Sequence, residues 1–444
     1  MPNILLIGNG AREHAIAEAL MRSGHQPRLF SYMKSNNPGI ASLSEKVATG
    51  SYNDMGAIQK FAGSCRSHFA IIGPEDPLNN GIVDMLKDSG IPAIGPTKSL
   101  ARLETSKSFT RQLLEKYHIP GNPKFKNFSS LSDIESYISE LQYSGNIVIK
   151  PDGLTGGKGV LVQGDHFHSK DDALRHCQDI LKEHAHVIIE EKMEGEEFSL
   201  QCFCDGKTVA AAPPVQDHKR RFVDDKGPNT GGMGSYSYEN HTLPFLKSQD
   251  VPDALAITQK VADAIYRETG NLYKGIMYGG FIAAREGVKL LEYNARLGDP
   301  EAMNILPLLK TDFVELCQAI IEGTLDRLKI IFDNKATVCK YVVPKGYGLP
   351  ANHPEAGSAS SRINIGNVGQ ARLYYASVDK RADGLYMSAS RAVAAVGIAE
   401  TISKAERIAE HAISAIQGAV DHRPDIGTKA AIEKRVEHMK QIRG

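Results

Sequence analysis

A glycine-rich turn between two apolar runs is the feature that most constrains what this chain can form. Residues 146–160 read Asn-Ile-Val-Ile-Lys-Pro-Asp-Gly-Leu-Thr-Gly-Gly-Lys-Gly-Val, with a strand-like run on each side of the glycines. Glycines let backbone N–H groups approach an anion, and Lys150 and Lys158 add positive charge. The segment therefore predicts a loop that covers nucleotide phosphates, with an ordinary hairpin loop as the alternative. Gly159 stands where a Walker A loop has Ser or Thr, which excludes that motif.

A second segment, residues 288–301, predicts a strand that ends in oxygen-bearing side chains. Its sequence is Val-Lys-Leu-Leu-Glu-Tyr-Asn-Ala-Arg-Leu-Gly-Asp-Pro-Glu. Because side chains alternate along a strand, Glu292 and Asn294 share one face, where two hard oxygens suit Mg²⁺ held against phosphates. A strand that merely ends in a polar turn at Gly298 is the alternative.

The composition favours a multidomain α/β enzyme and excludes several other classes. The 444 residues suggest about two to four domains, and 41% hydrophobic residues with 41 glycines suit a mixed α/β fold. Basic and acidic residues number 52 each, which excludes the basic surface of a nucleic-acid-binding or membrane-surface protein. The chain shows neither a signal-peptide pattern nor the roughly 18–20 apolar residues of a membrane span, so we expect a cytoplasmic protein. Six scattered cysteines predict no disulfide framework.

The first part of the chain alternates between apolar runs and helical patterns. Strands are expected over residues 4–7, 28–32 and 69–73, and helices over residues 12–22 and 82–87. This alternation is typical of a parallel sheet that binds its ligands at the carboxyl ends of the strands.

Two turns at that expected sheet edge carry candidate binding residues. Residues 8–14 open the first helix, whose N-terminal N–H groups and Arg12 suit a phosphate. Glu13 occupies the position of the third glycine in a dinucleotide fingerprint, which argues against a hydride-transfer enzyme. Residues 73–77, Gly-Pro-Glu-Asp-Pro, offer Glu75 to sugar hydroxyls, with a plain proline turn as the alternative.

The middle of the chain predicts a small domain bounded by a hinge. A helix begins near residue 105 with Lys107 at its start, where a cation suits a phosphate, although most such lysines are simply exposed. The small domain covers residues 121–195 and ends in a strand over residues 187–193. The acidic turn at residues 194–197 suits a hinge that presents backbone groups to an adenine and a carboxylate to a ribose, with a solvated surface turn as the alternative.

Two polar stretches, residues 216–220 and 227–234, are expected as long loops. They are rich in charge and in glycine, respectively. Loops of this kind often carry function, so we expect both near the active site.

The order of these features resembles the ATP-grasp ligases, and a set of motifs resembles one family among them. The motifs are Gly-Asn-Gly-Ala-Arg-Glu-His-Ala at 8–15, Gly-Pro-Glu at 73–75, Gly-Pro-Thr-Lys at 95–98, Gln-Asp-His-Lys-Arg at 216–220, Pro-Asn-Thr-Gly-Gly-Met-Gly at 228–234, Arg-Leu-Gly-Asp-Pro-Glu at 296–301 and His-Arg-Pro-Asp-Ile-Gly at 422–427. In this order they resemble the phosphoribosylamine:glycine ligase family, also called the glycinamide ribonucleotide synthetases. The resemblance extends over most of the chain.

The resemblance implies a reaction and its reactants. ATP would phosphorylate the carboxylate of glycine, and the amine of 5-phosphoribosylamine would attack the acyl phosphate to give glycinamide ribonucleotide, ADP and phosphate in de novo purine synthesis. Such chemistry needs charge neutralisation and alignment more than a protein nucleophile. The cofactors implied are ATP with Mg²⁺ or Mn²⁺, and the chain would act as a monomer or homodimer without nucleic-acid or membrane partners.

The resemblance also implies site residues, position by position. For ATP it implies Lys107, Lys150, Gly156, Gly157, Lys158, Glu190, Glu191, Met193 and Glu197. For phosphoribosylamine it implies Gly10, Arg12, Glu13, Glu75 and Asp299, and for the metal Glu292 and Asn294, the rest of the ligand set staying open. At the reaction centre it implies Arg296 for the acyl phosphate, Asp217 for the glycine ammonium, and the loop that contains Asn229 and Gly232.

The domain organisation expected from these features has four parts. They are an N-terminal parallel α/β domain (1–104), a central ATP-grasp domain (105–120 and 196–328), a small mobile lid domain (121–195) and a C-terminal α+β domain (329–444). In the last part, apolar runs at residues 336–343, 371–375 and 391–396 predict the strands of a separate sheet, and a helix follows over residues 404–416.

Two other functions stay open on the sequence alone. One is another ADP-forming ATP-grasp ligase with a different carboxylate or amine. The other is a nucleotide-binding regulatory protein without turnover, which the presence of both Glu292 and Arg296 disfavours.

Overall fold

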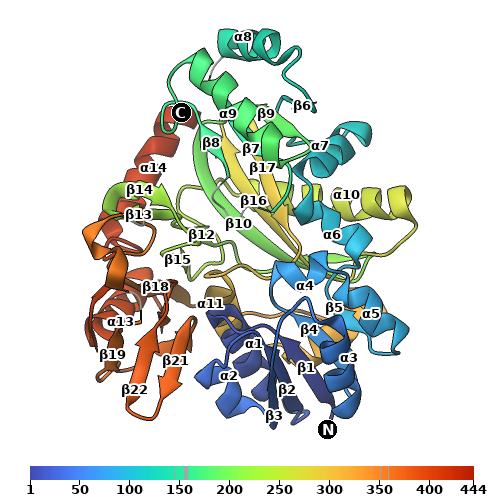
Figure 1. Ribbon diagram of the computed structural model, residues 1–444, viewed down its shortest axis with the longest axis vertical. Coiled ribbons are helices and arrows are strands. Elements are labelled where there is room, and N and C mark those ends of the chain that lie inside the picture. Colours follow the sequence, from blue (N-terminus) through green and yellow to red (C-terminus); the bar gives the residue numbers. More distant parts are fainter. Residues whose placement is uncertain (145, 155–158, 351, 359) are drawn as a thin grey trace.

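The structure is a computed structural model that describes residues 1–144, 146–154, 159–350, 352–358 and 360–444. It confirms the predicted multidomain α/β and α+β fold class. Figure 1 shows an N-terminal parallel sheet at the bottom, a small sheet with two helices at the top, and the C-terminal strands at the lower left, beside the N-terminal sheet.

The N-terminal sheet is parallel, with the strand order β3-β2-β1-β4-β5. Its strands are β1 (Asn3–Ile7), β2 (Arg28–Met33), β3 (Lys46–Thr49), β4 (Phe69–Ile72) and β5 (Ala93–Ile94). Its helices are α1 (Ala11–Met21), α2 (Pro38–Leu43), α3 (Met55–Ser64), α4 (Glu75–Asn79), α5 (Ile82–Asp88) and α6 (Lys98–Thr105). Ile7 pairs with both Tyr32 and Ile72, so the turns that follow β1 and β4 lie together at the carboxyl edge, as predicted.

The predicted lid contains an antiparallel sheet with a hydrophobic core of its own, and we keep the name lid for residues 121–195. Its order is β6-β9-β7-β8. Its elements are β6 (Phe125–Phe128), α8 (Ile134–Ser144), β7 (Ile147–Pro151), β8 (Leu161–Val162), α9 (Lys170–Glu183) and β9 (Val187–Glu191). Ile149 and Ile189 belong to a cluster with residues of α8 and α9. Since side chains alternate along each strand, Lys150 and Glu190 face the opposite side, toward the rest of the molecule.

The central sheet has the antiparallel order β11-β10-β16-β17. Its strands are β10 (Gly195–Cys204), β11 (Val209–Ala211), β16 (Gly275–Ala284) and β17 (Gly287–Asn294). The helices of this region are α7 (Lys107–Lys116), α10 (Asp250–Thr269), α11 (Ala302–Ile305) and α12 (Phe313–Glu322), with 3-10 turns at Leu306–Leu308 and Leu325–Arg327. On β17, Glu292 is opposite Gly280 and Asn294 is opposite Tyr278.

The three strands predicted in the C-terminal part pair with one another in a sheet distinct from the N-terminal and central sheets, but this sheet extends beyond the C-terminal part because residues 216–217 and 234–237 join it. One sheet has the order β12-β15-β18-β23-β20, with β25 also paired to β18, and a second has the order β21-β22-β19-β24. The strands are β12 (Gln216–Asp217), β13 (Arg220–Phe222), β14 (Lys226–Asn229), β15 (Gly234–Ser237), β18 (Ala336–Pro344), β19 (Arg362–Ile365), β20 (Arg372–Tyr375), β21 (Val378–Arg381), β22 (Gly384–Met387), β23 (Val393–Ala399), β24 (Ile416–Gln417) and β25 (Val420–Asp421). The remaining elements are α13 (Ile402–Ser414), α14 (Lys429–Arg443) and 3-10 turns at Val223–Asp225 and Pro354–Ser358.

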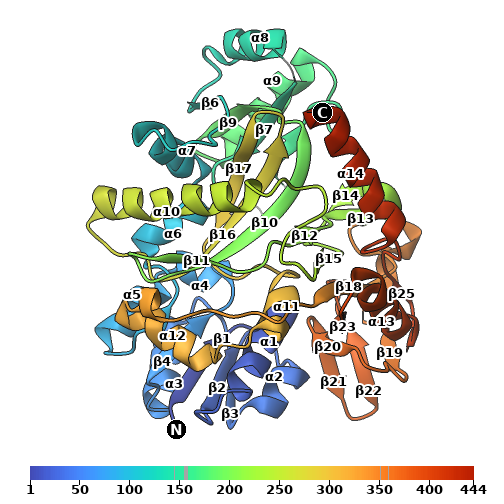
Figure 2. The same ribbon diagram turned by 180° about the vertical axis from the view of Figure 1, so that it is seen from behind.

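The same pairing corrects the prediction of two long loops. Residues 216–220 and 227–234 contain parts of four short strands, and β15 pairs with β18 along four residue pairs. β15 pairs with the distant β18, whereas β12 pairs with β15 and β13 with β14 nearby in the sequence, and residues 218–219 and 230–233 stay outside these strands. Figure 2 shows α14 beside β10, where it reaches toward the lid.

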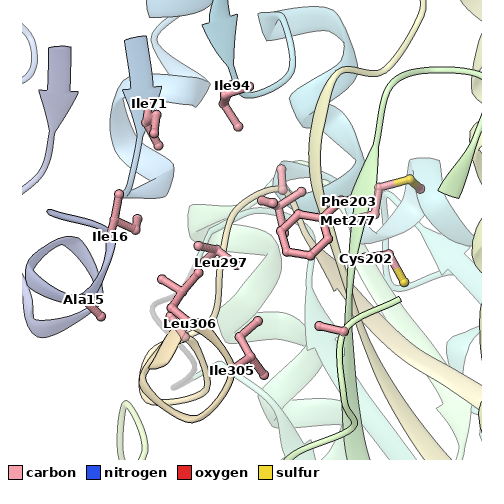
Figure 3. Close-up of a cluster of buried hydrophobic side chains, with 14 of the residues drawn as sticks. Ala15, Ile16, Ile71, Ile94, Cys202, Phe203, Met277, Leu297, Ile305 and Leu306 are labelled. Carbon is pink, nitrogen blue, oxygen red and sulfur yellow. The ribbon is translucent and has the colours of Figure 1, made fainter. Parts of the chain in front are cut away.

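The N-terminal, central and C-terminal parts share one hydrophobic core. Figure 3 shows Ile71 and Ile94 of the N-terminal sheet on one side and Phe203 and Met277 of the central sheet on the other, with Leu297 between them. Among the described residues, no helix is long and apolar enough to cross a membrane. The shared core fixes the carboxyl edge of the N-terminal sheet relative to β17, whereas the lid has a core of its own.

Candidate active site

A buried charge network lies on the inner face of the lid sheet. Lys150 Nζ is 2.8 Å from Glu190 Oε2, since β7 and β9 place the two side chains on the same face. Arg111, from α7, donates from Nε to Glu190 Oε1 at 2.7 Å and from Nη2 to Oε2 at 3.0 Å. Burial raises the pKa of Glu190, but Arg111 and Lys150 outweigh it and lower the pKa to about 2. Glu190 is therefore ionised and paired at both oxygens.

The predicted metal-binding strand lies within reach of several cations. Glu292 and Asn294 share one face of β17, as the alternation predicted. Burial raises the pKa of Glu292, but the surrounding cations lower it below its ordinary value: Lys219, Lys107, Lys150 and Arg296. Four cations from separate segments of the chain thus bring positive charge to one carboxylate.

The beginning of the glycine-rich turn is attached to α7. Lys107 Nζ donates to the carbonyl oxygen of Gly153 at 2.9 Å. Asp152 accepts hydrogen bonds from Ser106 Oγ and from the Ser108 backbone N–H, both at 3.2 Å. The lysine predicted at this helix start therefore stands beside the turn. Gly156, Gly157 and Lys158 lie outside the described residues.

The hinge residues take different positions. Glu191 Oε1 accepts from the Lys124 backbone N–H at 2.8 Å, at the edge of the lid sheet. Met193 lies between β9 and β10, and the exposed Glu197 is 3.3 Å from Lys219 Nζ. Of these three, Glu197 is the one that stands near a cation of the group around Glu292.

Glu13 supports the turn after β1 from inside. Its Oε2 accepts from the Gly10 backbone N–H at 2.6 Å and its Oε1 from Arg12 Nε at 2.5 Å. A Cβ atom on Gly8 would lie 2.3 Å from Glu13 Cγ, and Gly8 has a φ of +137°, so glycine is required there.

Arg296 joins the central region to the carboxyl edge of the N-terminal sheet. Its Nε is 3.4 Å from Glu75 Oε2, and its Nη2 is 3.3 Å from Glu104 Oε1. Burial raises the pKa of Glu75, but Arg296 and Arg12 outweigh it and lower the pKa to about 2. Arg12 Nη1 donates to the Leu297 carbonyl oxygen at 3.1 Å, so both arginines belong to one network.

The predicted reaction centre contains the carboxylate of Asp217, one oxygen of which is unpaired among the described residues. Asp217 Oδ1 is buried and has no hydrogen-bond partner among the residues that the structure describes. Burial and the nearby Glu301 raise its pKa well above the ordinary value, against the opposite influence of Lys219 and Arg391. A Cβ atom on Gly232, whose φ is +102°, would lie 2.8 Å from that oxygen.

A C-terminal arginine holds the loop that follows Asn229, the last residue of β14. Arg391 Nη1 donates to the carbonyl oxygens of Gly231, Gly232 and Asp299 at 2.6, 3.2 and 3.0 Å. Its guanidinium lies 4.5 Å from the centre of the Tyr341 ring, and the Tyr341 hydroxyl donates to Asp299 Oδ1 at 2.5 Å. Asp299 therefore faces the C-terminal part of the molecule.

Sequence reasoning missed several charged residues of this region: Arg111, Glu104, Glu301 and Arg391. Glu301 stood inside a motif and was passed over. Arg111 falls four residues after Lys107 on α7, which is a signal that the two share a helix face. No local pattern distinguishes Glu104 or Arg391 from surface charges.

Family models match most of the chain. The phosphoribosylglycinamide synthetase N domain matches residues 2–104, its ATP-grasp domain residues 105–302 and its C domain residues 337–429. The phosphoribosylamine–glycine ligase of Methanocella arvoryzae is 45% identical over 441 residues, which are 99% of this chain and 100% of that relative. The one of Methanocaldococcus jannaschii is 47% identical over 447 residues, covering 99% of both chains.

Solved structures share the fold. The phosphoribosylamine–glycine ligase of Thermotoga maritima superposes with a TM-score of 0.80 at 25% identity, covering 95% of this chain and 99% of that one. A biotin carboxylase of Campylobacter jejuni superposes with a TM-score of 0.71 at 14% identity, covering 99% of this chain and 95% of that one. The second likeness concerns the fold alone.

Proposed function

The chain belongs to the phosphoribosylglycinamide synthetase family, and we propose that it is the ADP-forming ligase that joins glycine to 5-phosphoribosylamine in purine biosynthesis. The products are glycinamide ribonucleotide, ADP and phosphate. One observation carries the proposal: Lys107 and Lys150, predicted for ATP, and Arg296, predicted for the acyl phosphate, act together on the carboxylate of Glu292, the predicted metal ligand, and lower its pKa.

The family implies a divalent cation, and the donor set fits one. Glu292 and Asn294 offer two oxygen ligands on one strand face, the chemistry that Mg²⁺ and Mn²⁺ prefer. Among the described residues no group of three His, Cys, Asp or Glu side chains gathers to hold a metal, so ATP phosphates and water would complete the ligand set. A bound Mg²⁺ or Mn²⁺ would neutralise phosphate charge during the transfer.

On the ATP side, the lid and α7 bind and orient the nucleotide. Lys107 and Lys150 hold its phosphates, together with the glycine-rich turn that contains Gly156, Gly157 and Lys158. The hinge residues Glu190, Glu191, Met193 and Glu197 border the adenosine. Closing the lid sheet over β17 excludes water from the transferred phosphoryl group.

On the other side, the chain positions two substrates in turn. Asp217 binds the ammonium group of glycine, and Arg296 steadies the phosphoryl group as a glycine carboxylate oxygen attacks the γ-phosphorus and ADP leaves. The amine of phosphoribosylamine then attacks the acyl carbon, phosphate leaves with the electrons of the C–O bond, and the nitrogen loses a proton.

The remaining contacts surround the second substrate. Gly10, Arg12 and Glu13 form the turn that receives phosphoribosylamine, with Glu75 for the ribose hydroxyls and Asp299 beside the loop that contains Asn229 and Gly232. We further propose the four domains bounded at residues 1–104, 105–120 with 196–328, 121–195 and 329–444, a cytoplasmic location, and a monomer or homodimer.

A label on oxygen tests the chemistry. Glycine with heavy oxygen in its carboxylate is incubated with ATP, Mg²⁺ and phosphoribosylamine, and the released phosphate is analysed by mass spectrometry. A glycyl phosphate intermediate transfers one heavy oxygen to phosphate, because the C–O bond breaks in the second step. Unlabelled phosphate formed together with the amide product would overturn the mechanism.

A further inference from the structure

Arg111 is among the most deeply buried charged side chains in the described part of the protein, and no role in the reaction has been assigned to it so far. Its exposed fraction is 2%. All three of its side-chain nitrogens donate. Beyond the two bonds to Glu190, Nη1 donates to the Leu290 carbonyl oxygen at 2.9 Å, and Nη2 donates to the Leu291 carbonyl oxygen at 2.8 Å. A planar guanidinium can form this set of bonds, whereas an ammonium group on a flexible stem cannot.

These bonds join three segments whose relative positions matter for the reaction. Glu190 belongs to β9, the last strand of the lid, and Leu291 immediately precedes Glu292 on β17. The third segment leads into the lid: Arg111 Nη1 lies 3.4 Å from Asn122 Oδ1, and Asn122 Nδ2 donates to the Arg111 carbonyl oxygen at 3.0 Å. Arg111 therefore stands where α7, the lid and the strand of Glu292 meet.

Lys150 completes the arrangement. Its Nζ lies 2.8 Å from Glu190 Oε2 and 3.3 Å from the Leu291 carbonyl oxygen, the same two partners that Arg111 Nη2 contacts. When Lys150 turns to a phosphate, Arg111 remains as the cation that neutralises Glu190 and keeps the lid strand against β17.

We propose that Arg111 is a positioning residue for ATP: it fixes Glu190 and the backbone at residues 290–291, so that Lys150 and Glu292 face the same phosphates. This inference rests on the proposed function, in which those two groups act on ATP. A purely structural ion pair would lower stability without changing the affinity for ATP.

The test is the variant Arg111→Lys, which keeps the positive charge but loses the planar guanidinium and its set of hydrogen bonds. The dissociation constant of MgATP is measured by calorimetry without glycine, and the KM values for ATP and glycine are measured in turnover. We expect MgATP affinity to fall roughly tenfold, with a matching rise of the KM for ATP and a KM for glycine unchanged within about twofold.

Arg443→Lys is the matched control. Arg443 is likewise buried and donates to a carboxylate, Asp250, and to a backbone carbonyl oxygen, that of Ala284, both at 2.7 Å. It lies on α14, so its replacement is expected to lower Tm and leave MgATP affinity unchanged. Asn122→Ala is a milder variant for the case that Arg111→Lys does not fold, and it is expected to weaken MgATP binding in the same direction by a smaller factor.

The outcomes separate this proposal from the proposed function. Unchanged MgATP affinity in folded Arg111→Lys, or an equal loss in Arg443→Lys, overturns the positioning role. If Arg111→Lys does not fold, unchanged affinity in Asn122→Ala overturns it. Wild-type protein that binds MgATP but never forms the amide overturns the ligase function, while the comparison of MgATP affinities still decides the role of Arg111. Wild-type protein that does not bind MgATP overturns both.

Discussion

Glu190 and Asp217 are two carboxylates near the proposed site, and their surroundings differ. Glu190 accepts hydrogen bonds from two buried cations, and its pKa is lowered to about 2. Asp217 has a buried oxygen without a partner among the described residues and stands near Glu301, so its pKa is raised. Burial opposes ionisation of both, and their partners decide the result.

The difference indicates where a substrate must bring charge. The lid side is electrostatically complete without ligand, so ATP has to replace existing pairs, and Lys150 is the cation that can leave Glu190 while Arg111 stays. The Asp217 side is incomplete and gains from a cation. The ammonium group of glycine provides one, which is the role proposed for this residue.

Glu292 lies between the two sides, and its removal is expected to have the largest effect. Glu292→Ala deletes a charged oxygen ligand among four cations, so kcat should fall roughly a thousandfold or more with the fold intact. Steady-state ADP release and circular dichroism check this. Glu286→Ala, on the exposed turn of the same hairpin, is the control and should keep wild-type activity. Substantial activity in Glu292→Ala would remove the metal assignment.

Glu190→Gln tests the lid side, where the carboxylate of Glu190 is paired with two cations. It leaves Arg111 and Lys150 buried without a charged partner, so the free energy of unfolding at pH 7 should fall by about 3–5 kcal/mol. The folded pKa of Glu190 lies below its ordinary 4.5, so its contribution is present above that value and is lost as pH falls toward about 2. The difference between variant and wild type in urea unfolding should therefore shrink over that interval. A difference that stays constant with pH would contradict the pairing.

Asp217→Asn tests the carboxylate that has an oxygen without a partner among the described residues, and its effect on stability should have the opposite sign to that of Glu190→Gln. The folded pKa is raised above the ordinary 3.8, so ionised Asp217 destabilises the ligand-free protein as pH rises above that value. Removing the charge should raise Tm at pH 7 by roughly 1–4 °C, and the gain should vanish near pH 3. The KM for glycine should rise as well. A lower Tm together with an unchanged KM for glycine would contradict the difference described between Asp217 and Glu190.

The smallest effect is expected at the exposed contact between the lid and the rest of the molecule. Arg220 Nη2 is 2.6 Å from Asp165 Oδ2, which lies in the turn after β8, and both side chains reach solvent. Asp165→Asn should change the free energy of unfolding by less than about 1 kcal/mol. Its MgATP affinity should stay close to that of wild type. A large loss would mean that this exposed pair, rather than Arg111, sets the position of the lid.

The N-terminal sheet could be predicted because its information is local. Continuous apolar runs marked β1, β2 and β4, and helical patterns marked α1 and α5. The strand β3 was missed because its sequence, Lys-Val-Ala-Thr, has no continuous apolar run, and β5 was missed because it has only two residues. Such short strands exist through their neighbours in the sheet and leave little trace in the sequence.

One error in the rest of the fold arises from pairing between distant segments. The C-terminal strands were expected in their own sheet, but β15 joins them through β18. Nothing in residues 234–237 indicates that their partners lie about a hundred residues further along the chain. The polar strands β12, β13 and β14 were taken for loops because they are short and lack an apolar alternation.

The family and its reaction could be predicted because motifs preserve the residues that meet the substrates. Glu292, Asn294, Lys107 and Lys150 were singled out from local patterns and from the resemblance to the family, and in the structure both lysines lower the pKa of Glu292. Arg111 could not be found from the sequence in this way: a charged residue on an amphipathic helix usually faces solvent, and no motif marks this one as an exception. Its burial depends on β9 and β17, which reach it only in the folded protein.

The most direct test of the whole account is ADP release measured with ATP and Mg²⁺ while glycine and phosphoribosylamine, made in place from ribose 5-phosphate and ammonia, are omitted in turn. Sustained release is expected only when both are present, because the acyl phosphate forms on glycine and the amine consumes it. Release that ignores glycine but responds to another carboxylate would contradict the substrate assignment, and ATP binding without turnover under all conditions would contradict the ligase function.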